Sequence, residues 1–262
     1  MKKIIFTDLD GTMLDYKTYS YEKSLKAIKL LKKDDIPLIF CSSKTKAEIE
    51  HYRKKLNNNH PFISENGAAI FIPKHYFNSK FKYNKENKSY YIIEFGANIK
   101  KLNSVLNKIK KEIKLKSFID MSAKEIANDS GLLLRLAKLA KKRDYDIPFK
   151  LIENNNEKKL TKLIKKNELN YTKGGRYYHI IGNNNKGKAT KTLINIYKKE
   201  FKKIVTYGFG NSKNDLEMLN AVDNGYIIKS FNNKYASNKY KKAQGVGPKG
   251  FNNEILKLLK NG

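Results

Sequence analysis

Strand-like and helix-like segments alternate through both ends of this chain, and this alternation constrains the fold more than any other feature. Short apolar runs predict strands at 4–7, 36–41, 62–71, 203–207 and 225–229. Apolar residues at helical spacing predict helices at 21–33, 45–56, 186–202, 214–221 and 252–260. The pattern is typical of an α/β fold, a doubly wound and mostly parallel, Rossmann-like sheet covered by helices on both faces.

The middle of the chain has a different pattern. Strands are expected at 89–95, 149–153 and 171–181, and helices at 98–114, 131–142 and 156–167. We therefore expect an inserted α+β cap domain at 82–182, and a core domain built from 1–81 and 183–262. Asparagine triplets at 57–59, 154–156 and 183–185 predict loops.

The formal charge of +30, from 55 Lys and Arg against 25 Asp and Glu, raises the question of a nucleic-acid partner. The excess is mostly lysine spread along the chain together with many Asn, Ile and Tyr, which is what an AT-rich genome would encode. We therefore expect a small anionic partner, which a positive field would attract, rather than nucleic acid or a membrane. The single cysteine, Cys41, and a strand that starts at once favour a cytoplasmic protein.

The first strand ends in two carboxylates, Asp8 and Asp10, followed by Gly11 and Thr12. Residues two apart on a strand point to the same side, so these like charges invite a divalent cation. Asp8 could attack phosphorus as a nucleophile, while Asp10 protonates the leaving group and then activates water. The alternative is an acidic strand end with an ordinary turn.

Two further strand ends carry polar groups. After the second strand come Ser42, Ser43 and Lys44, whose hydroxyls and neighbouring helix N–H groups could bind phosphate. Helix capping explains these residues equally well. After a later strand, Gly210, Asn211, Ser212, Asn214 and Asp215 offer oxygen ligands for Mg²⁺, or a capped turn.

Lys186 opens the helix that follows the inserted segment, where a cation could neutralise a phosphoryl group. Lys188 is the alternative at this position.

Taken in order, these four segments resemble the motifs of the haloacid dehalogenase-like phosphatases. Asp8 to Thr12 match the first motif, Ser42 the second, Lys186 the third and Gly210 to Asp215 the fourth. The resemblance implies Mg²⁺-dependent phosphomonoester hydrolysis through an aspartyl-phosphate. It implies catalytic roles for Asp8, Asp10, Ser42 and Lys186, with Asp8, Asp10, Asn211 and Asp215 at the metal.

The inserted segment resembles the large α/β cap of the Cof-like branch, and Glu65, Asn66 and Gly67 look like its substrate-side loop. Segments 139–149 and 174–179 are similar to cap signatures of the mannosyl-3-phosphoglycerate phosphatases. The resemblance implies that the substrate contacts Ser43, Lys44, Glu65, Asn66, Gly67, Arg143, Gly175, Arg176 and Asn214. Arg143 and Arg176 suit a carboxylate, although a structural cap salt bridge explains either arginine equally well.

Two residues depart from the family pattern. Asn211 stands where the fourth motif usually has a metal-binding Asp, which removes one negative charge. Ile147 stands before Pro148, where the cap motif usually has an acidic residue. We expect His179 to be structural, because the mechanism already has its acid and base.

The leading hypothesis is therefore hydrolysis of mannosyl-3-phosphoglycerate to mannosylglycerate, a compatible solute. The alternatives are a phosphatase for glucosyl-3-phosphoglycerate, a hexose phosphate or a sucrose phosphate, and a low-activity polyanion-binding protein on the same fold.

Overall fold

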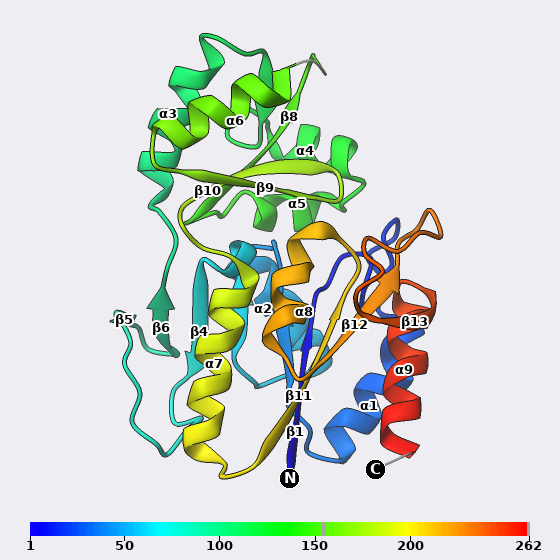
Figure 1. Ribbon diagram of the computed structural model, residues 1–262. Coiled ribbons are helices and arrows are strands. Elements are labelled where there is room, and N and C mark those ends of the chain that lie inside the picture. Colours follow the sequence, from blue (N-terminus) through cyan, green and yellow to red (C-terminus); the bar gives the residue numbers. More distant parts are fainter. Residues whose placement is uncertain (154–155, 261–262) are drawn as a thin grey trace.

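The computed structural model describes residues 1–153 and 156–260, so most of the expected loop at 154–156 lies outside the described residues. The chain forms a core and a smaller cap, stacked one above the other (Figure 1). No helix among the described residues has the length and apolar character needed to cross a lipid bilayer.

The core is built on a nine-stranded sheet with the order β13-β12-β11-β1-β2-β3-β4-β6-β5. Its strands are β1 (Lys2–Thr7), β2 (Leu38–Cys41), β3 (Phe62–Ser64), β4 (Ala69–Pro73), β5 (Lys85–Glu86), β6 (Tyr90–Glu94), β11 (Ile204–Gly210), β12 (Asn224–Lys229) and β13 (Lys241–Val246). The pairs from β13 to β3 are parallel, and those from β3 to β5 are antiparallel. The predicted fold class is confirmed.

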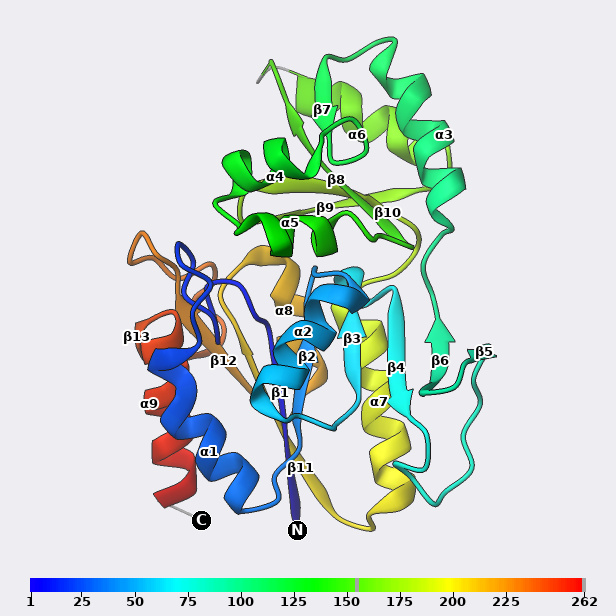
Figure 2. The same ribbon diagram turned by 180° about the vertical axis from the view of Figure 1, so that it is seen from behind.

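Helices cover both faces of this sheet, as the two opposite views show (Figures 1 and 2). One face packs against α1 (Leu25–Lys33), α2 (Lys46–Leu56) and α9 (Pro248–Lys260), and the other against α7 (Lys186–Glu200) and α8 (Leu216–Ala221). Strand alternation divides the core accordingly: Ile5 packs on the first side, whereas Ile4 and Phe6 pack on the second.

The cap contains a four-stranded antiparallel sheet with the order β7-β8-β10-β9. Its strands are β7 (Leu115–Ser117), β8 (Asp146–Leu151), β9 (Asn170–Gly174) and β10 (Tyr177–Ile181). Helices α3 (Ile99–Lys110) and α6 (Glu157–Lys166) pack on one face. Helices α4 (Ala123–Ser130) and α5 (Leu134–Ala140) form a separate cluster that includes Tyr177 and reaches Tyr19 of the core.

One boundary differs from the sequence-based division. Strands β5 and β6 lie within the segment 82–182, yet both belong to the nine-stranded sheet. β6 pairs with β4, with Ala69 opposite Glu94 at one end and Pro73 opposite Tyr90 at the other. The apolar side chains of β6 extend the core sheet, so we propose that the cap begins after Glu94.

Candidate active site

The carboxyl ends of β1, β2 and β11 meet at the edge of the core sheet that faces the cap. β1 and β11 are parallel, with Lys2 opposite Ile204 and Thr7 opposite Phe209. The Asp8 backbone N–H donates to the Phe209 carbonyl at 2.9 Å. This register places Asp8 beside the loop that begins at Asn211. The sequence prediction that these strand ends form one site agrees with the pairing.

Asp8 shares a buried lysine with Asp215. The Lys186 Nζ lies 2.6 Å from Asp8 Oδ1 and 2.6 Å from Asp215 Oδ1. Lys186 is 1% exposed, and its place at the start of α7 is fixed by Asn185, whose side chain accepts from the Lys188 backbone N–H at 2.7 Å. The lysine of the third motif thus holds the carboxylates of the first and fourth motifs.

Burial raises the pKa of Asp8 to about 7, and the neighbouring Asp215 charge adds to the rise while Lys186 opposes it. When a carboxylate with a raised pKa ionises, its buried negative charge destabilises the folded protein unless further cations balance it. The site is therefore short of positive charge despite the very basic chain.

Asp10 has its own lysine. Lys44 is buried and places Nζ 2.9 Å from Asp10 Oδ2 and 3.2 Å from Glu48 Oε1. Glu48 is held in turn by the capping box with Thr45 at the start of α2. The other Asp10 oxygen, Oδ1, is buried and has no hydrogen-bond partner among the described residues.

The residues around that unpartnered oxygen fit a hard divalent cation. Asp8 and Asp10 supply carboxylate oxygens, and Asn211 supplies an amide oxygen that accepts from the Thr12 hydroxyl at 3.2 Å. A group of three or more acidic, His or Cys side chains suited to a metal does not occur within 1–153 and 156–260, and the third oxygen donor here is the amide of Asn211.

Both carboxylate oxygens of Asp215 already have partners within the protein. Oδ1 binds Lys186, and Oδ2 accepts from the Asn211 and Ser212 backbone N–H groups and from the Ser212 hydroxyl, at 2.9–3.1 Å. Through these hydrogen bonds Asp215 shapes the loop that presents Asn211. Its predicted role as a metal ligand stays a prediction.

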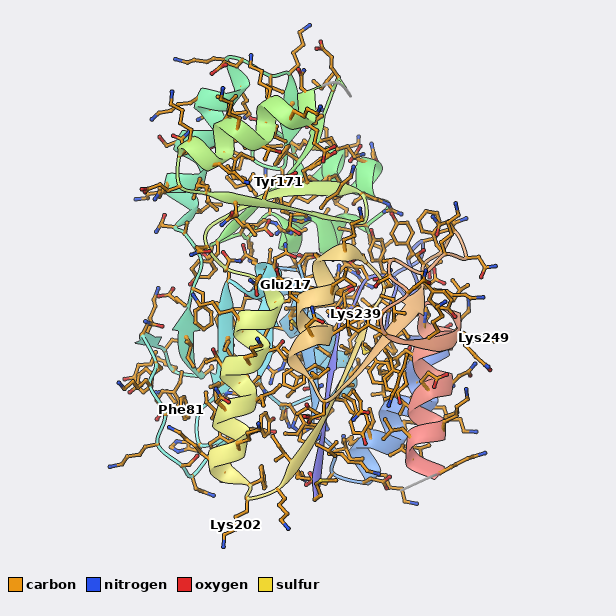
Figure 3. The ribbon with its side chains drawn as sticks, viewed as in Figure 1. Phe81, Tyr171, Lys202, Glu217, Lys239 and Lys249 are labelled. Atoms are coloured by element: carbon orange, nitrogen blue, oxygen red, sulfur yellow. The ribbon has the colours of Figure 1, made fainter. Side chains whose placement is uncertain are left out.

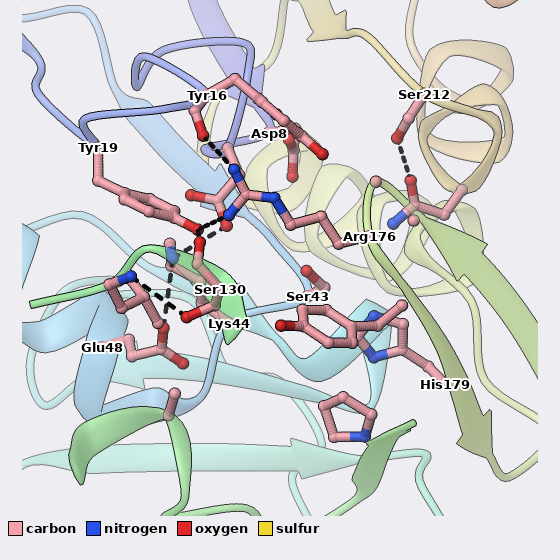
Figure 4. A pocket seen from close by; sticks show the side chains of 18 of the residues that line it. Asp8, Tyr16, Tyr19, Ser43, Lys44, Glu48, Ser130, Arg176, His179 and Ser212 are labelled. Atoms are coloured by element: carbon pink, nitrogen blue, oxygen red, sulfur yellow. Dashed lines mark hydrogen bonds and ion pairs between the residues drawn. The ribbon is translucent and has the colours of Figure 1, made fainter. Parts of the chain in front are cut away.

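A cavity of about 100 Å³ lies between this edge and the cap (Figure 4). Predicted site residues that line it are Asp8, Asp10, Ser43, Lys44, Arg143, Gly175, Arg176, Asn211 and Asn214. Ser42 is fully buried beside it, and its hydroxyl accepts from the Lys44 backbone N–H at 3.3 Å.

The two cap arginines have different surroundings. Arg143 is used within the protein: Nη1 lies 2.8 Å from Asp146 Oδ1 and 3.1 Å from the Ser43 carbonyl, and Nε donates to the Ala140 carbonyl. This favours the structural alternative for Arg143. Arg176 lies over the Tyr16 ring, 4.6 Å from its centroid, and donates to the Tyr19 hydroxyl at 2.9 Å (Figure 4).

The predicted substrate-side loop instead joins cap to core. Glu65 accepts from the backbone N–H groups of Asp144 and Tyr145, and Gly67 packs against the Asn185 backbone. Asn66 donates to Asp146 Oδ2 at 2.7 Å and accepts from Asn214 at 3.0 Å. Glu65, Asn66 and Gly67 do not line the cavity above Asp8 and Asp10, although Asn66 lines a second cavity beside Lys186 and Asn214. Their contact with substrate stays a prediction.

Sequence reasoning missed Asp146, Glu48, Tyr16 and Tyr19. Asp146 is fully buried and binds Arg143, Asn66 and the Nδ1 of His179, which lies 2.9 and 3.0 Å from its two oxygens. Burial raises the pKa of Asp146, but His179 and Arg143 outweigh it and leave that pKa lowered. The alternation of β8 was the available signal, because Asp146 and Pro148 face away from the apolar Ile147 and Phe149.

Hydrogen bonds run without a break from cap to core. We call this the cap-to-core path; its members are His179, Asp146, Asn66, Asn214, Ser212, Asp215, Lys186 and Asp8. Ser212 joins Asn214 through its hydroxyl and Asp215 through its backbone N–H.

A family model described as haloacid dehalogenase-like hydrolase matches residues 5–239. This chain is a haloacid dehalogenase-like hydrolase. The family assignment made from the four motifs is therefore confirmed, and hydrolases of this superfamily are typically Mg²⁺-dependent.

Two relatives are similar in sequence to this hydrolase over most of its length. A glucosyl-3-phosphoglycerate/mannosyl-3-phosphoglycerate phosphatase of Methanococcoides burtonii is 48% identical over 99% of this chain and 98% of its own. A mannosyl-3-phosphoglycerate phosphatase of Pyrococcus horikoshii is 37% identical over 91% of this chain and 95% of its own.

Solved structures share the fold of this hydrolase at low identity. A protein of Thermoplasma acidophilum superposes with a TM-score of 0.70 at 17% identity, covering 99% of both chains. The sucrose-phosphatase of Synechocystis does so with a TM-score of 0.61 at 13% identity, covering all of this chain and 98% of that one.

Proposed function

We propose that this protein is a Mg²⁺-dependent phosphatase of glycosyl-3-phosphoglycerates, which releases phosphate from the mannosyl and glucosyl forms. The observation that carries the proposal is the pair Asp8 and Asp10, each held by its own buried lysine, beneath a cap that supplies Arg176. The names of relatives that match nearly the whole chain agree with this substrate class.

In the first half of the reaction, an Asp8 oxygen attacks phosphorus as the bond to the leaving glycerate oxygen breaks. Asp10 gives its proton to that oxygen. Lys186 holds Asp8 through Oδ1, so the other Asp8 oxygen is left for the attack.

In the second half, Asp10 takes a proton from water as the water oxygen attacks phosphorus, and the bond between phosphorus and Asp8 breaks. Asp10 suits this exchange because its side chain is 30% exposed, whereas that of Asp8 is 8% exposed. Lys44 keeps Asp10 in place in both halves.

Asp8, Asp10 and Asn211 would hold Mg²⁺, with Asp215 in contact through water. A bound ion would supply positive charge beside Asp8, whose pKa is raised by burial, and would balance the charge of the phosphoryl oxygens.

Arg176 is our choice for the carboxylate of the glycerate, because Arg143 is already paired with Asp146. Ser43, Lys44, Gly175 and Asn214 line the remaining walls. Such a phosphorylated substrate does not cross membranes unaided, so we place the activity in the cytoplasm.

The test is steady-state phosphate release from a panel: mannosyl- and glucosyl-3-phosphoglycerate, hexose 6-phosphates and sucrose phosphate, each with and without Mg²⁺. We expect the two phosphoglycerates to have the highest kcat/KM, and Asp8→Asn to abolish turnover. Asp34→Asn, the same change at an exposed position, is the control. Release that is independent of Mg²⁺ or of Asp8 would refute the mechanism.

A second candidate substrate class is a simple sugar phosphate. It would be favoured if substrates without a carboxylate turn over equally well and Arg176→Gln leaves their kcat/KM unchanged.

A further inference from the structure

We propose that His179 binds a hydroxyl group of the substrate's sugar through its Nε2 atom. The inference rests on the proposed function, because it names the residue that would recognise the glycosyl part of the substrate. It reverses the expectation that His179 is purely structural.

The register of the cap sheet directs His179 toward the core. His179 pairs with Pro148 of β8, and both residues line the cavity above Asp8 and Asp10. Their neighbours Ile147 and Ile180 pack on the opposite side, in the interior of the cap. Figure 4 shows the His179 side chain at the cavity, on the cap strand that also leads to Arg176.

Asp146 fixes which ring nitrogen is free. An ionised carboxylate only accepts hydrogen bonds, and Asp146 already accepts from Arg143 at 2.8 Å and Asn66 at 2.7 Å. The Nδ1 of His179 must therefore carry the proton that it shares with Asp146. Nε2 has no hydrogen-bond partner among the described residues.

The free nitrogen suits a hydroxyl better than the other groups of the substrate. Nε2 accepts a hydrogen bond when the ring is neutral and donates one when it is charged, and a hydroxyl can serve in both cases. A carboxylate can only accept, and Arg176 is available for it. The phosphoryl group is placed by Asp8 and Lys186, on the core side of the cavity.

Two substitutions separate this role from a structural one. In His179→Asn the amide reaches the place of Nδ1 and can keep the bond to Asp146, but no atom replaces Nε2. In His179→Gln the amide reaches the place of Nε2 and the Asp146 contact is lost. If His179 binds substrate through Nε2, His179→Asn should be the more damaging change. If His179 only supports Asp146, His179→Gln should be the more damaging one.

The experiment measures kcat and KM for mannosyl- and glucosyl-3-phosphoglycerate, and for p-nitrophenyl phosphate, which has neither sugar nor glycerate. We expect His179→Asn and His179→Ala to raise KM for the glycosyl substrates about fivefold to tenfold with little change in kcat. His179→Gln should stay within about twofold of the wild type, and kcat/KM for p-nitrophenyl phosphate should change little in all three variants.

The inference is overturned if His179→Asn behaves as the wild type while His179→Gln is impaired, or if all substrates lose activity equally. In both cases the proposed function stands. If the wild type hydrolyses p-nitrophenyl phosphate but neither phosphoglycerate, the proposed substrate and the role of His179 fail together.

Discussion

At the scale of single residues, the site contains buried carboxylates and too few positive charges to balance them. Asp8 is the most affected, since burial and Asp215 raise its pKa to about 7 against an ordinary value of 3.8. A group whose pKa is raised by folding favours the folded state only while it is protonated. Its contribution to stability is lost as pH rises from about 4 through 7.

Replacing Asp8 should therefore make the metal-free protein more stable. We expect Asp8→Asn to raise the free energy of unfolding by about 1–2 kcal/mol at pH 8, and the gain should shrink toward pH 5, where the wild-type carboxyl is protonated. Urea unfolding in EDTA at several pH values checks this. A gain that is constant with pH would contradict the charge argument, and Asp34→Asn should show no gain.

Asn211 offers a second test at this scale. Asn211→Asp restores a carboxylate beside Asp8 and Asp10, so we expect about tenfold tighter activation by Mg²⁺ and a less stable metal-free protein.

The apparent Mg²⁺ constant from initial rates, together with calorimetric binding of Mg²⁺ alone, measures the effect of Asn211→Asp. Asn220→Asp makes the same change at an exposed residue of α8 and should alter neither quantity. An unchanged Mg²⁺ constant would show that Asn211 does not contact the ion.

At the scale of elements, the turn at Glu65–Gly67 determines how α7 begins. Gly67 has φ +83°, and a Cβ there would lie 2.1 Å from the Asn185 carbonyl oxygen, one residue before Lys186. The strand end, the turn and the helix that carries Lys186 are therefore packed without room for a methyl group.

Gly67→Ala should cost more than its backbone conformation alone. Gly131 is a matched control, because its φ is +76° but a Cβ there would meet nothing closer than 3.8 Å. We expect Gly131→Ala to lose about 1 kcal/mol of unfolding free energy, and Gly67→Ala to lose at least about 2 kcal/mol more and to lower kcat. Equal losses in urea unfolding would refute the close-packing argument.

The elements also show what sequence could and could not predict. Asp8, Asp10, Lys186 and Asn211 were predictable because each lies at a strand or helix end marked by local apolar patterns. Asp146 was harder to predict, because only Arg143 is local to it, whereas Asn66 and His179 come from distant segments that the tertiary fold brings together. The strands β5 and β6 join the core sheet although they lie within the segment expected to form the cap, since an apolar run does not reveal which sheet it joins.

At the scale of the whole molecule, the positive charge is dispersed. Figure 3 shows Lys202, Lys239 and Lys249 at separate parts of the core surface rather than along one stripe. This distribution argues against the polyanion-binding alternative and favours general attraction of a small anion.

The charge should act on substrate capture. We expect kcat/KM for the glycosyl-3-phosphoglycerates to fall about threefold to tenfold between 50 and 500 mM NaCl, because salt screens the attraction. Initial rates at low substrate concentration measure this, with sucrose at equal osmolarity as the uncharged control. A rate that does not depend on salt would show that the +30 charge plays no part in capture.

The cap-to-core path limits how this molecule can diversify by recombination. A cap grafted from a relative brings its own partner for Asn66, and the graft can place His179 and Asp8 correctly only if that partner matches. We therefore expect sugar preference to change more readily by point substitution on the cavity wall than by exchange of whole caps.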